Sequence, residues 1–306
     1  MRISNVLIAA TACVAAFPAA ASASTITSDG TNITYTNRGA AADVASSNTF
    51  PTTYVDAGAR LNAQGSCVAG PPVTCPGFST TATLGAGADT AKIASFGPVA
   101  ISGGGGGDGI YDWAATVSVD GAGGSDLLIG DANGLATITG GAADDRVFGR
   151  GAGVDLSGDG GADLVVSDAN NATLSGGNGA DTLVATKNAA AGHMNGDAGS
   201  DLLTADGVPM PILGGWTFDG GAGNDVIEAT GDGSTPDTVI CGPGGADTAY
   251  VDASDVVGAD CEYVVTGAPP AGSPVALAAA QGAAFKAAVA TVHPNALTPG
   301  PLLPGL

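Results

Sequence analysis

The feature that most constrains the fold is a motif, Gly-x-x-Gly-x-Asp, that recurs eight times through the middle of the chain, with Ala143 in place of the second glycine in one copy. Its first glycines are Gly103, Gly121, Gly140, Gly158, Gly176, Gly196, Gly220 and Gly242. Its aspartates are Asp108, Asp126, Asp145, Asp163, Asp181, Asp201, Asp225 and Asp247. Successive aspartates are 18, 19, 18, 18, 20, 24 and 22 residues apart, and a ninth, degraded copy runs from Gly85 to Asp89. This period is the signature of a solenoid, whose coils pack only on their neighbours.

Two other positions of each repeat are apolar. Two residues after the aspartate lie Ile110, Leu128, Val147, Val165, Leu183, Leu203, Ile227 and Ala249. Two residues before the first glycine lie Ile101, Val119, Ile138, Leu156, Leu174, Met194, Phe218 and Ile240, each followed by a mostly polar residue. Such alternation indicates short, half-buried strands. The sequence therefore predicts an all-β fold, a right-handed parallel β-roll or β-helix solenoid with about 18 residues per coil.

The aspartates of successive coils would form a single file along one edge. Equivalent positions in adjacent coils lie about 4.8 Å apart. Two bare carboxylates at that distance repel by about 3–4 kcal/mol at an effective dielectric of 20. Calcium would relieve this repulsion, because it accepts six to eight oxygens, including backbone carbonyls such as those of glycine turns. The eight aspartates and eight first glycines are thus the candidate calcium ligands, and a chelator is expected to loosen the repeats.

Composition and charge narrow the choice of partner. The chain has 51 glycines and only 5% aromatic residues, which suits a narrow stacked structure better than a globular core. The net charge is −21, with 29 acidic residues against 8 Lys plus Arg. A nucleic-acid partner is excluded, because binding to phosphates needs a basic surface. A cell-surface glycan or another protein stays open as a partner besides calcium.

The repeats resemble a known family. The segments 176–183 (GGNGADTL) and 220–227 (GGAGNDVI) closely resemble the nonapeptide of haemolysin-type calcium-binding repeats, also called repeats-in-toxin. The resemblance covers about residues 84–251. It implies a parallel β-roll with calcium between adjacent coils, held by the sixth-position aspartate and carbonyls of the glycine turn. The chain departs from the family in its N-terminal export signal, in lacking a toxin or protease domain, and in keeping the motif only in alternate nonapeptides.

The N-terminus reads as an export signal. Arg2 precedes an apolar stretch at 6–17, and Ala21-Ser22-Ala23 is a small-residue cleavage site, so residues 1–23 are predicted to be removed. The protein is therefore expected to be secreted. The mature chain keeps Cys67, Cys75, Cys241 and Cys261, an even number that predicts disulfides. Pairing by proximity would join Cys67 to Cys75 and Cys241 to Cys261, although three pairings are formally possible.

The segments that flank the repeats differ from them and divide the chain into four parts. Residues 1–23 are the signal, 24–80 a small β cap, 81–264 the solenoid, and 265–306 a Pro/Ala-rich tail. In the cap, residues 25–27 and 32–36 predict a hairpin. In the tail, Ser273 would cap a helix with Pro274 in its first position. Leu277, Ala284, Phe285, Ala288 and Val289 would share a face of this helix, which is too weakly apolar to span a membrane.

The sequence favours a non-enzymatic, calcium-binding extracellular protein with a structural or adhesive role. A polysaccharide-active enzyme, a lyase or hydrolase, is the alternative. It has little support, because the two histidines, His193 and His293, lie in different regions and Arg146 and Arg150 are the only close basic pair. A second alternative is binding of ice or another surface by a hydroxyl row. Thr137, Thr139, Thr173, Ser175 and Thr217 would form this row, broken by Asp155 and His193.

Overall fold

A computed structural model describes the greater part of the chain. The described residues are 25–28, 32–36, 43–46, 52–56, 62–65, 73–75, 79–93, 97–112, 114–131, 134–186, 191–205, 215–230 and 235–290. The predicted export signal and Cys67 lie outside these residues, as does the tail beyond Ala290. The domain boundaries proposed from sequence stay predictions.

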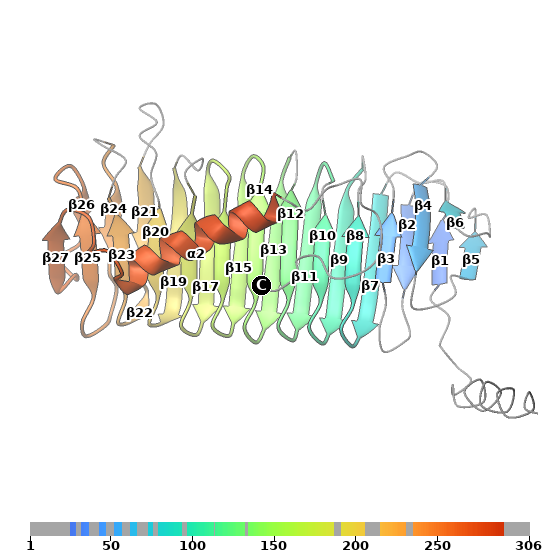
Figure 1. The fold of residues 1–306 in the computed structure, drawn as a ribbon, viewed down its shortest axis with the longest axis horizontal. Helices are drawn as coiled ribbons and strands as arrows, with labels where there is room; N and C mark the ends of the chain where they lie inside the picture. The colour runs from blue at the N-terminus through green and yellow to red at the C-terminus, as the bar shows by residue number, and fades with distance from the viewer. Residues whose placement is uncertain are drawn as a thin grey trace, which may run out of the picture.

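The chain winds into two long sheets that face each other (Figure 1). Sheet A contains, in spatial order, β26 (Val256–Val257), β24 (Thr238–Ile240), β21 (Trp216–Asp219), β19 (Gly192–Gly199), β17 (Ala172–Asn178), β15 (Val154–Gly160), β13 (Ala136–Ala142), β11 (Val117–Gly123), β9 (Val99–Gly105), β7 (Ser79–Ala86), β2 (Asn32–Thr36), β1 (Thr25–Ser28) and β5 (Asn62–Gly65), with β22 (Ala222–Gly223) beside β19. Sheet B contains β27 (Tyr263–Thr266), β25 (Thr248–Val251), β23 (Val226–Ala229), β20 (Leu202–Ala205), β18 (Thr182–Ala185), β16 (Leu164–Ser167), β14 (Arg146–Arg150), β12 (Leu127–Asp131), β10 (Gly109–Asp112), β8 (Thr90–Ile93), β3 (Asp43–Ser46), β4 (Thr52–Asp56) and β6 (Val73–Cys75).

The pairing confirms the predicted parallel β-solenoid. From β7 onward each strand pairs in parallel with the equivalent strand one coil away, as β11 does with β9 and β13. Each pair therefore joins residues about one repeat apart, such as Val119 and Ile138. The first strands depart from this pattern, because β1 and β2 form the predicted antiparallel hairpin and β4 pairs antiparallel with β3 and β6.

The two apolar columns predicted from the repeat form the core between the sheets, with one exception. Fifteen of the sixteen residues are buried in a single cluster, for example Leu156 and Val165, both 0% exposed. Ile240 was predicted wrongly, because it points outward and is 39% exposed. Val239 pairs with Phe218 and takes the inward place instead. The strand is displaced by one residue, and a one-residue shift moves every side chain to the other face.

The predicted C-terminal helix is present as α2 (Pro274–Val289), which lies across the outer face of sheet B (Figure 1). It begins as predicted, since the Ser273 hydroxyl accepts a hydrogen bond of 3.3 Å from the Ala276 N–H. The residues on its buried side are Val275, Ala278, Gly282, Phe285 and Val289. The predicted face was wrong for Leu277, which is 59% exposed, and for Ala284, which is exposed as well. The buried positions recur every three or four residues, and Leu277 falls outside that stripe.

Helix α2 covers apolar residues that point outward from sheet B. These residues are Tyr111, Ile129, Phe148, Leu164, Val166 and Val184. Phe285 meets Phe148 edge to face, with ring centroids 5.9 Å apart. Charged residues meet at the C-terminal ends of β12, β14 and β16. Lys286 Nζ contacts Asp168 Oδ1 at 2.5 Å, and Arg150 forms ion pairs with both Asp168 and Asp131. Both faces of this part of sheet B are therefore buried, as its runs of three apolar residues would indicate.

Replacing Phe285 with alanine is expected to release α2 while the solenoid stays folded. Removal of a buried aromatic side chain costs about 3–5 kcal/mol, and α2 has few other large buried side chains. Trypsin should then cleave after Lys286 much faster, because a docked helix resists proteolysis. Leu277→Ala on the exposed side of the same helix is the matched control. Equal cleavage rates for the two variants would contradict this packing.

Candidate calcium-binding edge

The predicted aspartates lie in one row along the turn that leads from sheet A to sheet B. In each coil, Oδ1 of the aspartate accepts a hydrogen bond from the backbone N–H of the aspartate one coil earlier. These bonds run without interruption from Asp89 N–H to Asp247 Oδ1, with lengths of 2.6–2.8 Å. All eight predicted aspartates are therefore brought together, and we call this file of carboxylates the aspartate row.

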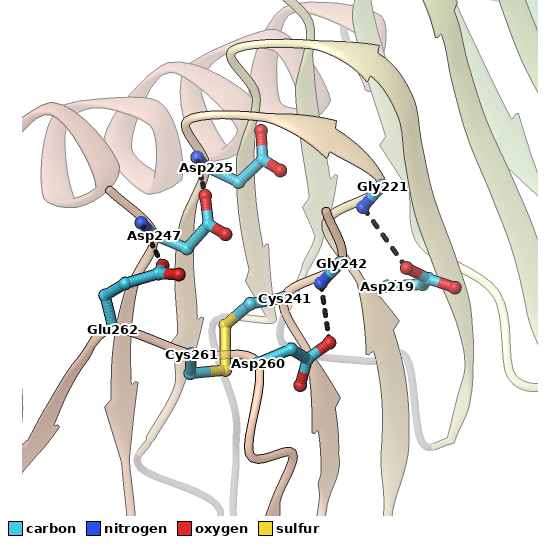
Figure 2. Close-up of a disulfide and its surroundings, with 9 residues drawn as sticks. All are labelled: Asp219, Gly221, Asp225, Cys241, Gly242, Asp247, Asp260, Cys261 and Glu262. Carbon is cyan, nitrogen blue, oxygen red and sulfur yellow. Dashed lines mark hydrogen bonds between the residues drawn. A yellow bond between two sulfur atoms is a disulfide. The ribbon is translucent and has the colours of Figure 1, made fainter. Parts of the chain in front are cut away.

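The row is longer than the eight repeats by one residue at each end. Asp89 of the degraded ninth copy occupies its first place. Glu262 occupies its last place, where Oε2 accepts a bond of 3.0 Å from the Asp247 N–H (Figure 2). Sequence reasoning missed Glu262, because no glycine motif precedes it. The available signal was the neighbouring Cys261, whose pairing with Cys241 fixes the register of the last coil.

The second oxygen of each carboxylate is buried and has no hydrogen-bond partner. This holds for Oδ2 of Asp108, Asp126, Asp145, Asp163, Asp181, Asp201, Asp225 and Asp247, none of which is more than 3% exposed. A buried polar atom without a partner is costly, and more so when it carries charge. Native structures seldom leave such atoms unpaired. Each of these eight Oδ2 atoms is therefore expected to carry a proton or to lie beside a cation.

The first glycines bring backbone oxygens close to these carboxylates. A Cβ added to Gly103 would lie 2.5 Å from Asp108 Oδ2 and 2.8 Å from the carbonyl oxygen of Gly121 in the next coil. The same two kinds of oxygen flank Gly176 at 2.5 and 2.8 Å. A side chain has no room here, which explains why the motif requires glycine. The edge thus presents carboxylate and carbonyl oxygens together, the donors that calcium prefers.

Gly242 does not occupy the first-glycine position predicted for it. A Cβ added to Gly220, the first glycine of its motif, would meet the carbonyl oxygen of Cys241. A Cβ added to Gly242 would instead meet the carbonyl oxygen of Gly221, the second residue of that motif. Cys241 therefore takes the first position of the last repeat. The physical reason is an extra residue, since Cys241 and Asp247 are six positions apart whereas Gly220 and Asp225 are five apart. Asp247 still enters the row.

The Cys241–Cys261 disulfide is present and closes the last coil (Figure 2). The two Cα atoms are 5.1 Å apart, within the range that disulfides need. Cys241 is completely buried and points into the core. The prediction that Cys67 pairs with Cys75 stays untested, because Cys67 lies outside the described residues.

Burial makes the row carboxylates weak acids. Desolvation raises the pKa of Asp108, Asp126, Asp163 and Asp225 from 3.8 to about 6. Desolvation, together with the charges of the carboxylates in adjacent coils, raises the pKa of Asp145 and Asp201 to about 7. The hydrogen bond from the preceding backbone N–H opposes the shift in each case. These six carboxylates therefore change protonation state near neutral pH, where a bound cation would have to compete with protons.

The arrangement differs from a compact metal site. Among the residues that the structure describes, no three His, Cys, Asp or Glu side chains converge on one point. The row supplies one carboxylate per coil, so a cation between coils would need two aspartates and several carbonyl oxygens. That donor set fits calcium and not zinc, which prefers nitrogen and sulfur. A cleft of about 620 Å³ runs beside the row from Asp108 to Asp163 and is bounded by Gln281 of α2.

Asp112 is a further buried carboxylate, but it lies outside the row. Its Oδ1 accepts a bond of 2.8 Å from the Ala114 N–H, and its Oδ2 has no partner. Burial raises its pKa well above the usual value. The residues paired with it in the adjacent strands are Ile93 and Gly130, neither of which carries a carboxylate. Asp112 is therefore not part of a second file of carboxylates in its strand register.

The predicted hydroxyl row lies on the outer face of sheet A. Thr137 and Thr173 flank Asp155, and His193 follows them in the same column of paired residues. The column is interrupted as expected, and nothing in its geometry adds support for binding a crystal surface.

No family model matches the chain, and no curated protein or solved structure matches it either. In the part of the chain that the structure describes, no helix is long and apolar enough to span a membrane.

Proposed function

We propose that the protein is a secreted calcium-binding repeat protein with a structural or adhesive role outside the cell, in which calcium stabilises the solenoid. The observation that carries the proposal is the file of eight buried, partnerless Oδ2 atoms. An enzymatic role has no comparable support. The resemblance to haemolysin-type repeats agrees with this proposal and stays a prediction.

The residues of the chain would act together when calcium binds. Calcium supplies positive charge that offsets the repulsion between neighbouring carboxylates. Oδ2 of the aspartates in adjacent coils would hold the ion, together with carbonyl oxygens of the first glycines. The backbone bond to each Oδ1 keeps the carboxylate oriented before any ion arrives, which lowers the ordering cost of binding. Because the ligands of each ion come from two coils, binding would join the coils to each other.

Exchanging Asp145 and Asp163 for asparagine is expected to remove calcium sites without breaking the row. Asparagine keeps the Oδ1 that accepts the backbone hydrogen bond but loses the negative charge. Calorimetric titration should show fewer calcium ions bound per chain than in the native protein, whose sites should have dissociation constants of about 0.1–1 mM.

The matched control removes two exposed carboxylates from the outer face of sheet A. Asp120→Asn with Asp155→Asn removes the same two negative charges, but from residues on the solvent side. Calcium binding should be retained in this variant. Absence of binding to the native chain up to about 10 mM calcium, or an equal loss in both variants, would overturn the proposal.

A further inference from the structure

The solenoid ends at its C-terminal side in a coil whose strands pair on one side only. Within the described part of the chain, β27 hydrogen-bonds to β25 and β26 to β24, and each is the last strand of its sheet (Figure 1). The other edge of each strand presents backbone N–H and C=O groups. An open edge of this kind is a template for another strand.

Three of the four side chains of β27 are apolar and exposed, and they lie on both faces of the strand. Tyr263 is 58% exposed, Val264 49% and Val265 42%. Val264 pairs with Ala249, which is completely buried in the core, so the inner column of the solenoid stops at Val264 without cover. Val256 in β26 adds a further side chain that is 60% exposed. A continuous apolar strand is typical of a strand buried on both faces.

The described chain that follows β27 leads away from this end. Helix α2 contacts β23, β20, β18 and β16, and its last turns reach β14, where Phe285 and Val289 share a cluster with Phe148. From β14 to β27 is six strand steps, or about 29 Å. Helix α2 therefore covers the outer face of sheet B and not the open edges of β27 and β26.

We propose that two copies of the protein associate end to end through their last coils. A twofold axis beside β27 would place the strand antiparallel to β27 of the second copy, so sheet B would continue across the pair. Val264 of each copy would close the open core of the other, and backbone bonds along both strands would be satisfied. The surface is self-complementary, since the same apolar residues and the same unpaired edge face each other.

Acidic residues around this end limit the strength of the association. Asp260 and Glu262 precede β27, and Asp252 and Asp255 border β26. The rims of two copies repel each other, and salt screens such repulsion. The pairing should therefore tighten as ionic strength rises, with dissociation constants in the micromolar range, on the order of 1–100 μM.

Sedimentation or light scattering of the full chain in calcium, from about 1 to 500 μM protein, tests the proposal. The expected result is a shift from the monomer mass to twice that mass as concentration rises. Val264→Asp should keep the protein monomeric at every concentration. Tyr263→Lys, at an outward position that the fold does not need, should do the same. Leu135→Asp, which changes an equally exposed side chain elsewhere, should leave the dimer unchanged.

Three outcomes would overturn the proposal. The native chain could stay monomeric over the whole range, both with and without residues 291–306. It could dimerise only after those residues are removed, which would assign the end to the tail of the chain itself. It could form a ladder of masses above the dimer, which would indicate head-to-tail stacking on the N-terminal end.

Discussion

In a calcium chelator the protein is expected to be most stable near pH 4 and to lose stability as the pH rises toward 8. Burial raises the pKa of the row carboxylates, such as Asp145 and Asp201, from 3.8 to about 7 in the folded state. The folded protein therefore binds more protons than the unfolded chain between these values. Stability from this source is complete below pH 3.8 and disappears as the pH passes the folded pKa.

Calcium should reverse this dependence. An ion in place of the proton favours the deprotonated carboxylates, so calcium should bind more tightly, and stabilise more, as the pH rises from 5 to 8. Thermal unfolding followed by circular dichroism at each pH, with calcium and with a chelator, checks both trends. We expect the two melting temperatures to separate by about 10 °C or more at pH 8. A melting temperature in chelator that stays constant or rises from pH 5 to 8 would contradict the account.

A methyl group at a first glycine is expected to damage both the fold and the calcium site. In Gly103→Ala the new Cβ would lie 2.5 Å from Asp108 Oδ2 and 2.8 Å from the Gly121 carbonyl oxygen. Either the carboxylate or the neighbouring coil must move. We expect a loss of about 2–4 kcal/mol in the free energy of unfolding, together with weaker calcium binding at this coil.

Gly105→Ala provides a control within the same turn. A Cβ at Gly105 would have no atom within 4 Å. Its φ angle is not among the positive ones. Chemical denaturation of the two variants should therefore give a large effect at Gly103 and an effect within about 0.5 kcal/mol at Gly105. Similar effects at both positions would show that loss of glycine flexibility, and not the crowded oxygen edge, explains the motif.

Regular spacing made the solenoid and the aspartate row predictable from sequence. Once Asp126 and Asp145 occupy equivalent places, their neighbours fall into register, and the inward columns follow from strand alternation. The prediction was wrong where one residue is inserted. The extra residue beside Pro243 shifted Gly242 and Ile240 by one place, and periodicity alone gave no sign of it.

Long-range packing was the other part that the sequence did not reveal. The start of α2 was predictable, because capping at Ser273 and Pro274 is local. Its docking place on Phe148 and Val184 was not, because Phe148 and Phe285 are 137 residues apart in the chain and Val184 and Gly282 are 98 apart. The predicted helix face included Leu277, whereas it is Gly282 that packs close to Val184.

Diffraction from crystals grown with calcium, with its anomalous signal recorded, is the most direct test of the aspartate row as a binding edge. We expect peaks strung along this edge between successive aspartates, each within about 2.3–2.6 Å of an Oδ2 atom and of carbonyl oxygens of the glycine turns. An edge without peaks at millimolar calcium, or peaks confined to other surfaces, would contradict the account.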